Sequence, residues 1–215
     1  MTAPQRTRLR HATDARPASR EASAEPAGIR QRILDAAVSS LIEQGTARTT
    51  TLEVQRRAGV SRGALLHHFP TLAQLLSATV GELVLRNEQA VQESLAKLEG
   101  TTDAVERAIR VLAMATAQPA YMAELELWAV ARTDPELRAS LQDAERLARK
   151  DSERVLKSLF SASTDQPAQT MVVAMTLEFL RGLALSGVLR SSPARRQQLI
   201  AQWIRATKIL LETLR

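Results

Sequence analysis

Two short helices separated by only three residues constrain the fold of this chain more than any other feature of its sequence. Thr50, with Glu53 three residues later, has the pattern of a capping box that begins the first helix. Gly59 ends that helix, and Ser61 can cap a second one over residues 62–68. Two helices joined by a tight turn that contains glycine form a helix-turn-helix unit.

Similar start and stop signals predict helices along most of the chain. Aromatic residues make up only 3% of it, whereas alanine, leucine and arginine are frequent, and this composition favours helix over sheet. A second capping box, Thr71 with Gln74, begins a long helix. We therefore predict an all-α fold of about nine helices. Besides the two helices above, they are expected over residues 29–45, 71–98, 103–117, 120–131, 134–160, 171–189 and from 192 to the end.

The sequence divides into three predicted parts. Residues 1–28 mix arginines with proline, alanine, serine and threonine and show no apolar period, which predicts a disordered basic arm. A secretory signal is not expected there, because no apolar run of about seven residues follows the arginines. Residues 29–76 are expected to form a three-helix domain around the helix-turn-helix unit, and residues 77–215 a larger helical domain.

Positive charge is concentrated in the first third of the chain. Residues 1–72 contain eleven arginines and six acidic residues, and the whole chain has a net charge of +6. Such asymmetry indicates a polyanionic partner, with nucleic acid the first candidate and an anionic membrane the second. A basic face that only meets solvent is the alternative, and the arm itself is either an inert tail or a DNA contact.

The sequence lacks the residues that several classes of chemistry need. The chain has no cysteine, so disulfides and thiolate sites are excluded, and a reducing compartment such as the cytoplasm fits. It has no glycine-rich phosphate loop, nucleophile–base pair or metal-ligand spacing, so we predict neither an enzyme nor a cofactor. His67 and His68 point about 100° apart on a helix, which makes a shared metal ion difficult, and we predict no metal site.

The second helix of the unit carries residues suited to DNA. Arg62 lies in its first turn, where side chains meet base edges in the major groove, and its planar fork of donors matches O6 and N7 of guanine. His67 and His68 lie near the other end, where imidazoles commonly meet phosphate. A buried, hydrogen-bonded His68, with only His67 exposed, is the alternative interpretation.

The segment TTLEVQRRAGVSRGALLHHFPTLAQLL, from Thr50 to Leu76, closely resembles the N-terminal domain of TetR-type (TetR/AcrR) transcriptional regulators. The resemblance extends over about residues 29–76 and implies a buried phenylalanine at Phe69. Leu66, Leu72 and Gln55 depart from the tyrosine, lysine and alanine that are usual at these positions. His67, His68 and the arginines of the arm are our candidates to replace the missing phosphate contacts. The expected DNA-binding residues are Thr50, Ser61, Arg62, Gly63, Ala64, Leu66, His67 and His68.

The same resemblance implies that the last two long helices pair with those of a second subunit. The last helix carries an apolar stripe too wide to leave in water, and burial within its own subunit is the alternative. A two-fold dimer would present two recognition helices to the two halves of a near-palindromic operator. The expected interface residues are Leu183, Leu199, Trp203, Leu210 and Leu211.

The larger domain of this family commonly encloses a small-molecule pocket, and soft or aromatic side chains line adaptable cavities. For any one of these side chains, ordinary core packing is the alternative role. The pocket residues predicted here are Met114, Tyr121, Met122, Leu125, Trp128, Glu178, Phe179 and Arg181.

Residues 171–189 are nearly all apolar, so a membrane span must be considered. We reject it because Glu178 and Arg181 lie near the middle, where each charge costs roughly 2.5–3.5 kcal/mol on the insertion scale. A soluble helix that is apolar all round is expected to be buried all round. The two charges then pair with each other, pair across the dimer, or line a pocket.

These features predict a homodimeric repressor that a small-molecule effector releases from a palindromic operator. It is expected in the bacterial cytoplasm, associated with the nucleoid. The alternative is an architectural or adaptor helical protein that binds DNA without effector control.

Overall fold

The all-α prediction is confirmed. The computed structural model describes residues 26–98, 100–101, 103–139, 141–143, 146, 166–190 and 192–213, and within these residues the chain forms helices and no strands. In chain order the elements are α1 (Pro26–Gln44), the 3₁₀ helix η1 (Thr46–Arg48), α2 (Thr51–Ala58), α3 (Arg62–His68), α4 (Leu72–Lys97), α5 (Ala104–Ala115), α6 (Pro119–Ala131), α8 (Gln166–Leu189) and α9 (Pro193–Thr213).

Four of the predicted helix starts are confirmed by side-chain caps, whereas α8 begins at Gln166, five residues before the expected start. Thr50, Ser61 and Thr71 each accept a hydrogen bond from the backbone N–H three residues later, at 3.2, 3.1 and 3.1 Å. Asp103 does the same for α5, at 2.9 Å. Each cap satisfies one of the backbone donors that a helix leaves free at its first turn. The short α2 and α3 are therefore fixed locally at the ends that the helix-turn-helix geometry depends on.

Two details of the sequence interpretation are corrected. α1 begins at Pro26, so the last residues assigned to the arm are helical, while residues 1–25 lie outside the described part of the chain. The Glu53 carboxylate does not return to the backbone of Thr50, as a full capping box requires. It binds the guanidinium groups of Arg56 and Arg57 instead, because a charged donor is a stronger partner than an N–H.

The predicted helix over residues 134–160 is described only at its start. The Oδ1 atom of Asp134 accepts from the backbone N–H of Leu137 at 2.9 Å, and residues 135–139 and 141–143 are helical. The rest of that prediction lies outside the described residues, apart from residue 146.

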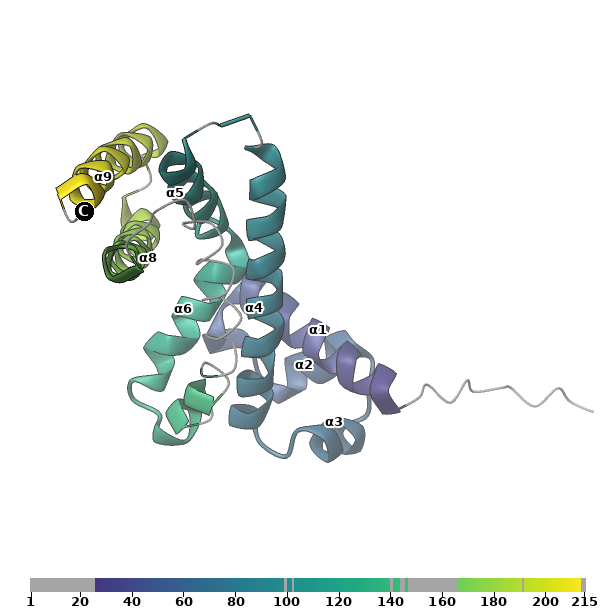
Figure 1. Cartoon of the computed structure of the whole chain (residues 1–215). Helices are drawn as coiled ribbons and strands as arrows, with labels where there is room; N and C mark the ends of the chain where they lie inside the picture. The colour runs from purple at the N-terminus through teal and green to yellow at the C-terminus, as the bar shows by residue number, and fades with distance from the viewer. Residues whose placement is uncertain are drawn as a thin grey trace, which may run out of the picture.

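Three apolar clusters organise the molecule, and α4 runs between them (Figure 1). The first holds α1–α3 and the start of α4 together, the second joins α1, α4 and α6, and the third lies among α5, α8 and α9. The helix-turn-helix unit thus lies at one end of the molecule and α8 and α9 at the other (Figure 1). The first cluster includes Ile33, Leu65 and Phe69, the second Leu41, Leu83 and Leu127, and the third Ile109, Leu180 and Ile204.

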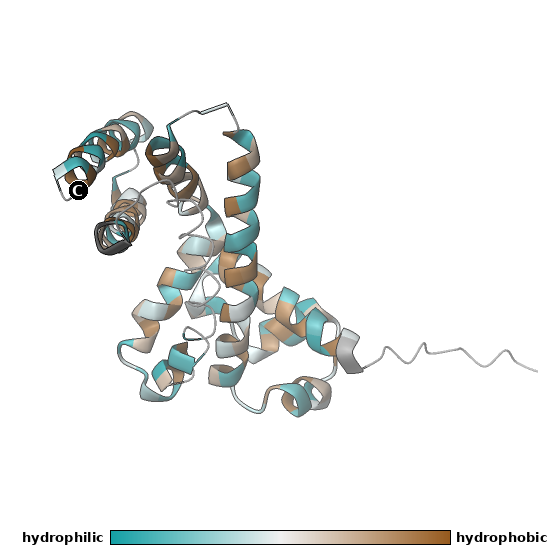
Figure 2. Cartoon of the chain, viewed as in Figure 1, coloured by the Kyte–Doolittle hydropathy of each residue, from teal (hydrophilic) through white to brown (hydrophobic). Residues whose placement is uncertain are grey.

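The expectation that the apolar helix is buried all round is wrong for the single chain. Among the described residues only Gln169–Leu189 is long and apolar enough to cross a membrane, with a mean hydropathy of 1.6, and just 22% of it is buried. One side packs on α5 and α9, while Glu178 stands on the other side with 69% of its side chain exposed. Figure 2 shows apolar turns along this helix. The outward apolar side chains are Met171, Met175, Leu185, Val188 and Leu189.

The cluster that joins α1, α4 and α6 makes a direct stability prediction. Leu127 is fully buried there, so Leu127→Ala should lower the free energy of unfolding by about 2–5 kcal/mol, through lost burial and the cavity left behind. Leu85 lies on α4 with 59% exposure, and Leu85→Ala should stay within about 0.5 kcal/mol of the native chain. Chemical denaturation monitored by circular dichroism measures both, and equal effects would contradict this assignment of the core.

Candidate nucleic-acid interface

The recognition helix α3 is anchored along one side and exposed along the other. Leu65 is 1% exposed and packs into the cluster formed with α1 and α2. Arg62 points into solvent from the first turn, next to the Ser61 cap. Of the predicted DNA-binding residues, Ala64 and His68 are half-buried. The others, Thr50, Ser61, Arg62, Gly63, Leu66 and His67, are exposed.

The two histidines form one end of this surface. Their rings meet edge to face, with centroids 5.3 Å apart and planes at 71°. His68 is half-buried, so it is neither enclosed as the alternative interpretation expects nor as exposed as His67. Both imidazoles remain near the C-terminal end of α3, where they can donate hydrogen bonds to phosphate oxygens.

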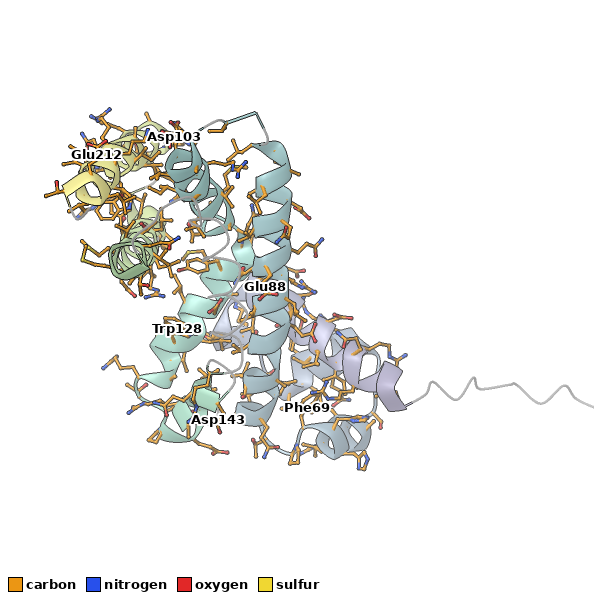
Figure 3. The ribbon with its side chains drawn as sticks, in the orientation of Figure 1. Phe69, Glu88, Asp103, Trp128, Asp143 and Glu212 are labelled. Carbon is orange, nitrogen blue, oxygen red and sulfur yellow. The ribbon has the colours of Figure 1, made fainter. Side chains whose placement is uncertain are left out.

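Phe69 fixes the end of α3 to α1. Its ring is 4% exposed, as the resemblance implied, and Figure 3 shows it beside the helix-turn-helix unit. The guanidinium carbon of Arg30 lies 5.4 Å from the ring centroid, in cation–π geometry. A buried aromatic ring with a cation on its face holds the recognition helix at a defined angle to α1.

An ion-pair network fixes α2 to α1. Arg57, with 17% of its side chain exposed, donates to Glu53 at 2.5 Å on its own helix and to Glu43 at 2.7 Å on α1. Arg56 donates to both oxygens of the Glu53 carboxylate, at 2.8 Å to the Oε1 that Arg57 also contacts and at 3.0 Å to Oε2. Hydrogen bonds from Arg56 and Arg57 lower the pKa of Glu53 from its usual 4.5 to about 2.

In the larger domain, a polar cluster lies between α4, α6 and α8. The guanidinium carbon of Arg181 lies 4.7 Å from the centroid of the Trp128 ring, and Arg181 also pairs with Glu178. Burial raises the pKa of the Tyr121 phenol above its usual 10, and nearby Arg181 offsets part of that effect. Four of the predicted pocket residues, Tyr121, Trp128, Glu178 and Arg181, are therefore neighbours.

The other predicted pocket residues are not shown at this cluster. Phe179 stacks on Trp203, with centroids 5.0 Å apart, in the cluster of α5, α8 and α9. Leu125 is buried, and Met114 and Met122 are half-buried. A groove of about 410 Å³ lies elsewhere, on the surface between α1 and α2, and is lined by Arg32, Asp35, Ala36, Ser39, Arg57 and Ala58.

Sequence reasoning missed three polar residues of the larger domain. Asn87 of α4 donates to the Glu124 carboxylate of α6 at 2.7 Å. The Oδ1 of Asn87, the Oε1 of Glu88 and the Nε of Arg181 are buried without a hydrogen-bond partner among the described residues. Figure 3 shows Glu88 on α4 and Trp128 on α6. A glutamate within the apolar stretch 119–131 was the signal in the sequence, since a buried carboxylate needs a partner.

The predicted dimer-interface residues differ in how far the single chain buries them. Leu211 is 6% exposed and lies in the chain's own core, and its expected contact with a second subunit stays a prediction. The indole N–H of Trp203 donates to Thr176 at 3.0 Å, and Leu183 packs against the same core. Leu199 and Leu210 are half-buried. The single chain therefore buries part of the apolar stripe of its last helix, and cover of the rest by a second subunit stays a prediction.

Sequence comparison supports the expected resemblance of the N-terminal domain. Residues 33–79 match the family described as bacterial regulatory proteins, tetR family. An uncharacterized HTH-type transcriptional regulator of Mycobacterium tuberculosis is 34% identical over 112 residues, which are 52% of this chain and 57% of that protein. The chain thus spans little more than half the length of this relative.

Solved structures share the fold over most of their length. A transcriptional regulator from Rhodococcus sp. Rha1 has a TM-score of 0.62 at 22% identity, and the match covers 86% of this chain and 96% of that one. The multidrug binding protein EbrR, complexed with proflavin, has a TM-score of 0.59 at 24% identity, with 85% and 99% covered. At these identities the likeness establishes the fold.

The Glu53 network predicts how stability depends on pH. Because the folded-state pKa lies near 2 and the usual value is 4.5, ionised Glu53 stabilises the folded chain above about pH 4.5, and this contribution is lost as the pH falls toward 2. Glu53→Gln should therefore melt below the native chain at pH 7, and the difference should shrink as the pH falls below 4.5. Thermal denaturation followed by circular dichroism measures this difference in melting temperature. A difference that is the same at both ends of this range would contradict the assignment.

Proposed function

We propose that this chain, whose residues 33–79 form a helix-turn-helix domain of the tetR family of bacterial regulatory proteins, is a DNA-binding transcriptional regulator. The observation that carries the proposal is the exposed first turn of α3, where Arg62 extends from a helix that Ser61 caps and Leu65 anchors. A base-reading side chain needs a rigid support of this kind, because its discrimination depends on geometry.

Each exposed residue of α3 has a role that follows from its chemistry. Arg62 donates two hydrogen bonds to O6 and N7 of a guanine, and Leu66 offers an apolar contact to a thymine methyl group. His67, His68 and the hydroxyl of Thr50 lie at the edges, where contacts to phosphate set the register on the duplex. Gly63, Ala64 and Ser61 let the helix approach the groove closely. We assign this DNA-binding role to residues 26–76 and the regulatory role to residues 77–215.

Selection of binding sites from random duplex DNA tests this function, and Arg62→Ala tests the residue. The variant should bind the selected site more weakly by about 1–3 kcal/mol and lose preference at one base pair in each half-site. Arg132→Ala removes an exposed arginine beyond the end of α6 and should leave both quantities unchanged. An Arg62→Ala variant with the native sequence preference would contradict this assignment.

An architectural protein that binds DNA without effector control is the second candidate, because it would use the same basic surface. The two functions differ in specificity. A regulator of defined operators should bind its selected site about 10³-fold or more tightly than unrelated DNA of the same length. Competition with nonspecific DNA at fixed salt separates them, since a ratio near one identifies the architectural protein.

The regulator acts as a homodimer that uses the outer side of α8. Met171, Met175, Leu185 and Leu189 recur at a spacing that places them on one stripe of the helix, and all are at least 40% exposed. Glu178 lies on the same stripe, and its carboxylate pairs with Arg181. Gly182 lies on the same stripe, and a Cβ there would meet no atom within 4 Å in the single chain. A glycine that its own subunit does not require leaves room for a partner helix to approach closely. Pairing two such stripes buries apolar surface that one chain leaves in water.

Leu185→Asp tests the dimer. A carboxylate in the middle of the stripe would be buried without a partner, so the variant should sediment as a monomer at concentrations where the native chain is a dimer. Leu85→Asp places the same charge at an exposed position of α4 and should remain dimeric. Analytical ultracentrifugation measures both. A dimeric Leu185→Asp variant would show that another surface joins the subunits.

A small amphipathic molecule bound near Tyr121, Trp128 and Arg181 is proposed to release the dimer from its operator in the bacterial cytoplasm. The polar cluster among α4, α6 and α8 supports this, because buried polar atoms without partners at Asn87 and Arg181 can bind groups of a ligand. The fold neighbour complexed with proflavin is consistent with a ligand site in this fold. By reciprocity, a bound effector and the operator must weaken each other's affinity by the same factor.

A further inference from the structure

A carboxylate of the larger domain binds the turn that precedes α2. The Oε1 atom of Glu126, on α6, accepts hydrogen bonds from both the backbone N–H and the hydroxyl of Thr46, each at 2.6 Å. Thr46 is the first residue of η1, which follows α1 directly. Hydrogen bonds to an ionised acceptor are roughly twice as strong as neutral ones. This contact therefore fixes one defined point of the DNA-binding domain against the larger domain.

The turn is shaped to receive this carboxylate. Gly45 has a φ of +75°, in the left-handed region that favours glycine, and a Cβ built there would lie 2.9 Å from the Oε1 of Glu126. Glycine is required here for its backbone angle, and its lack of a Cβ leaves room for the carboxylate.

Hydrogen bonds within the turn connect Thr46 to the start of α2. The hydroxyl of Thr49, at the end of the turn, donates to the Gly45 carbonyl at 2.8 Å and lies 3.0 Å from the hydroxyl of Ser40 in α1. The next residue, Thr50, caps α2. A displacement of Thr46 therefore moves the start of α2, and the three-residue turn passes this movement on to α3.

The opposite side of α6 meets the polar cluster of the larger domain. Glu124 accepts from Asn87 of α4, and the Trp128 ring lies against Arg181 of α8. Residues 124 and 126 are about 160° apart around a helix, so α6 has one side on this cluster and the other on the DNA-binding domain. A rigid helix in this position couples the two regions directly, in addition to any coupling through α4.

We propose that Glu126 is the positioning residue that holds the DNA-binding domain against α6 and thereby fixes the position of α2 and α3. The inference rests on the proposed DNA-binding function for its effect on affinity, but not for the contact itself. Glu126 touches no DNA in this scheme. It acts through Thr46 by restricting the orientations of the recognition helix before binding, which lowers the entropic cost of docking.

Glu126→Ala tests the role on operator DNA selected with the native full-length chain. The variant should bind that DNA about fivefold to tenfold more weakly, in the range usual for coupled sites, while its affinity for unrelated DNA stays unchanged. Glu126→Gln keeps an oxygen acceptor at the same place and should recover most of the loss. Ile109→Ala removes a fully buried side chain from the separate cluster of α5, α8 and α9, and it controls for simple destabilisation.

Hydrogen exchange measured by mass spectrometry tests the contact without DNA. In Glu126→Ala, backbone amides of residues 45–58 should exchange at least about five times as fast as in the native chain. Glu136→Ala changes an exposed position of the larger domain and should leave these exchange rates unchanged. Unchanged exchange, or native operator affinity in Glu126→Ala, would overturn the proposal. If the native chain selects no DNA sequence, the proposed function fails while the exchange result still decides the role of Glu126.

Discussion

The arrangement of this molecule depends on the packing of α1 against α4 and α6. Leu41, Leu83 and Leu127 are at most 2% exposed where these three helices meet, so the DNA-binding helices are not joined to the rest by a flexible linker. Protein interiors are close-packed and have few alternative arrangements. A change at one side of this cluster must therefore move whole helices rather than dissipate within side chains.

Local signals in the sequence identified most of the fold because they act within a few residues. The hydroxyls of Thr50, Ser61 and Thr71 cap helices with no help from distant parts of the chain, and the glycine at position 59 adopts the left-handed φ of 62° that ends α2. The Glu53 carboxylate shows the limit of this approach. Its pattern fitted a capping box, but arginines one turn away offered stronger partners.

The polar cluster and the Glu126 contact could not be predicted in the same way. Glu124 and Glu126 are two residues apart in an apolar stretch, and the sequence indicates only that each requires a partner. Their partners, Asn87 and Thr46, are 37 and 80 residues away and lie on opposite sides of α6. Pairings at such separation depend on how whole helices pack. The same holds for α8, whose uniform apolarity did not reveal which side its own subunit would cover.

The network around Arg57 also bears on how much of the positive charge of the DNA-binding domain remains available to DNA. Arg56 and Arg57 are engaged with Glu53 and Glu43, and Arg30 lies over the Phe69 ring. Each phosphate neutralised by a protein cation releases condensed counterions and makes the slope of log affinity against log salt more negative by about 0.9. Arginines that already pair with acidic residues of the fold neutralise few phosphates and therefore release few counterions. The proposed DNA-binding domain is therefore expected to interact less with the DNA polyelectrolyte than its arginine count implies, which would leave a larger share of its binding free energy to base contacts.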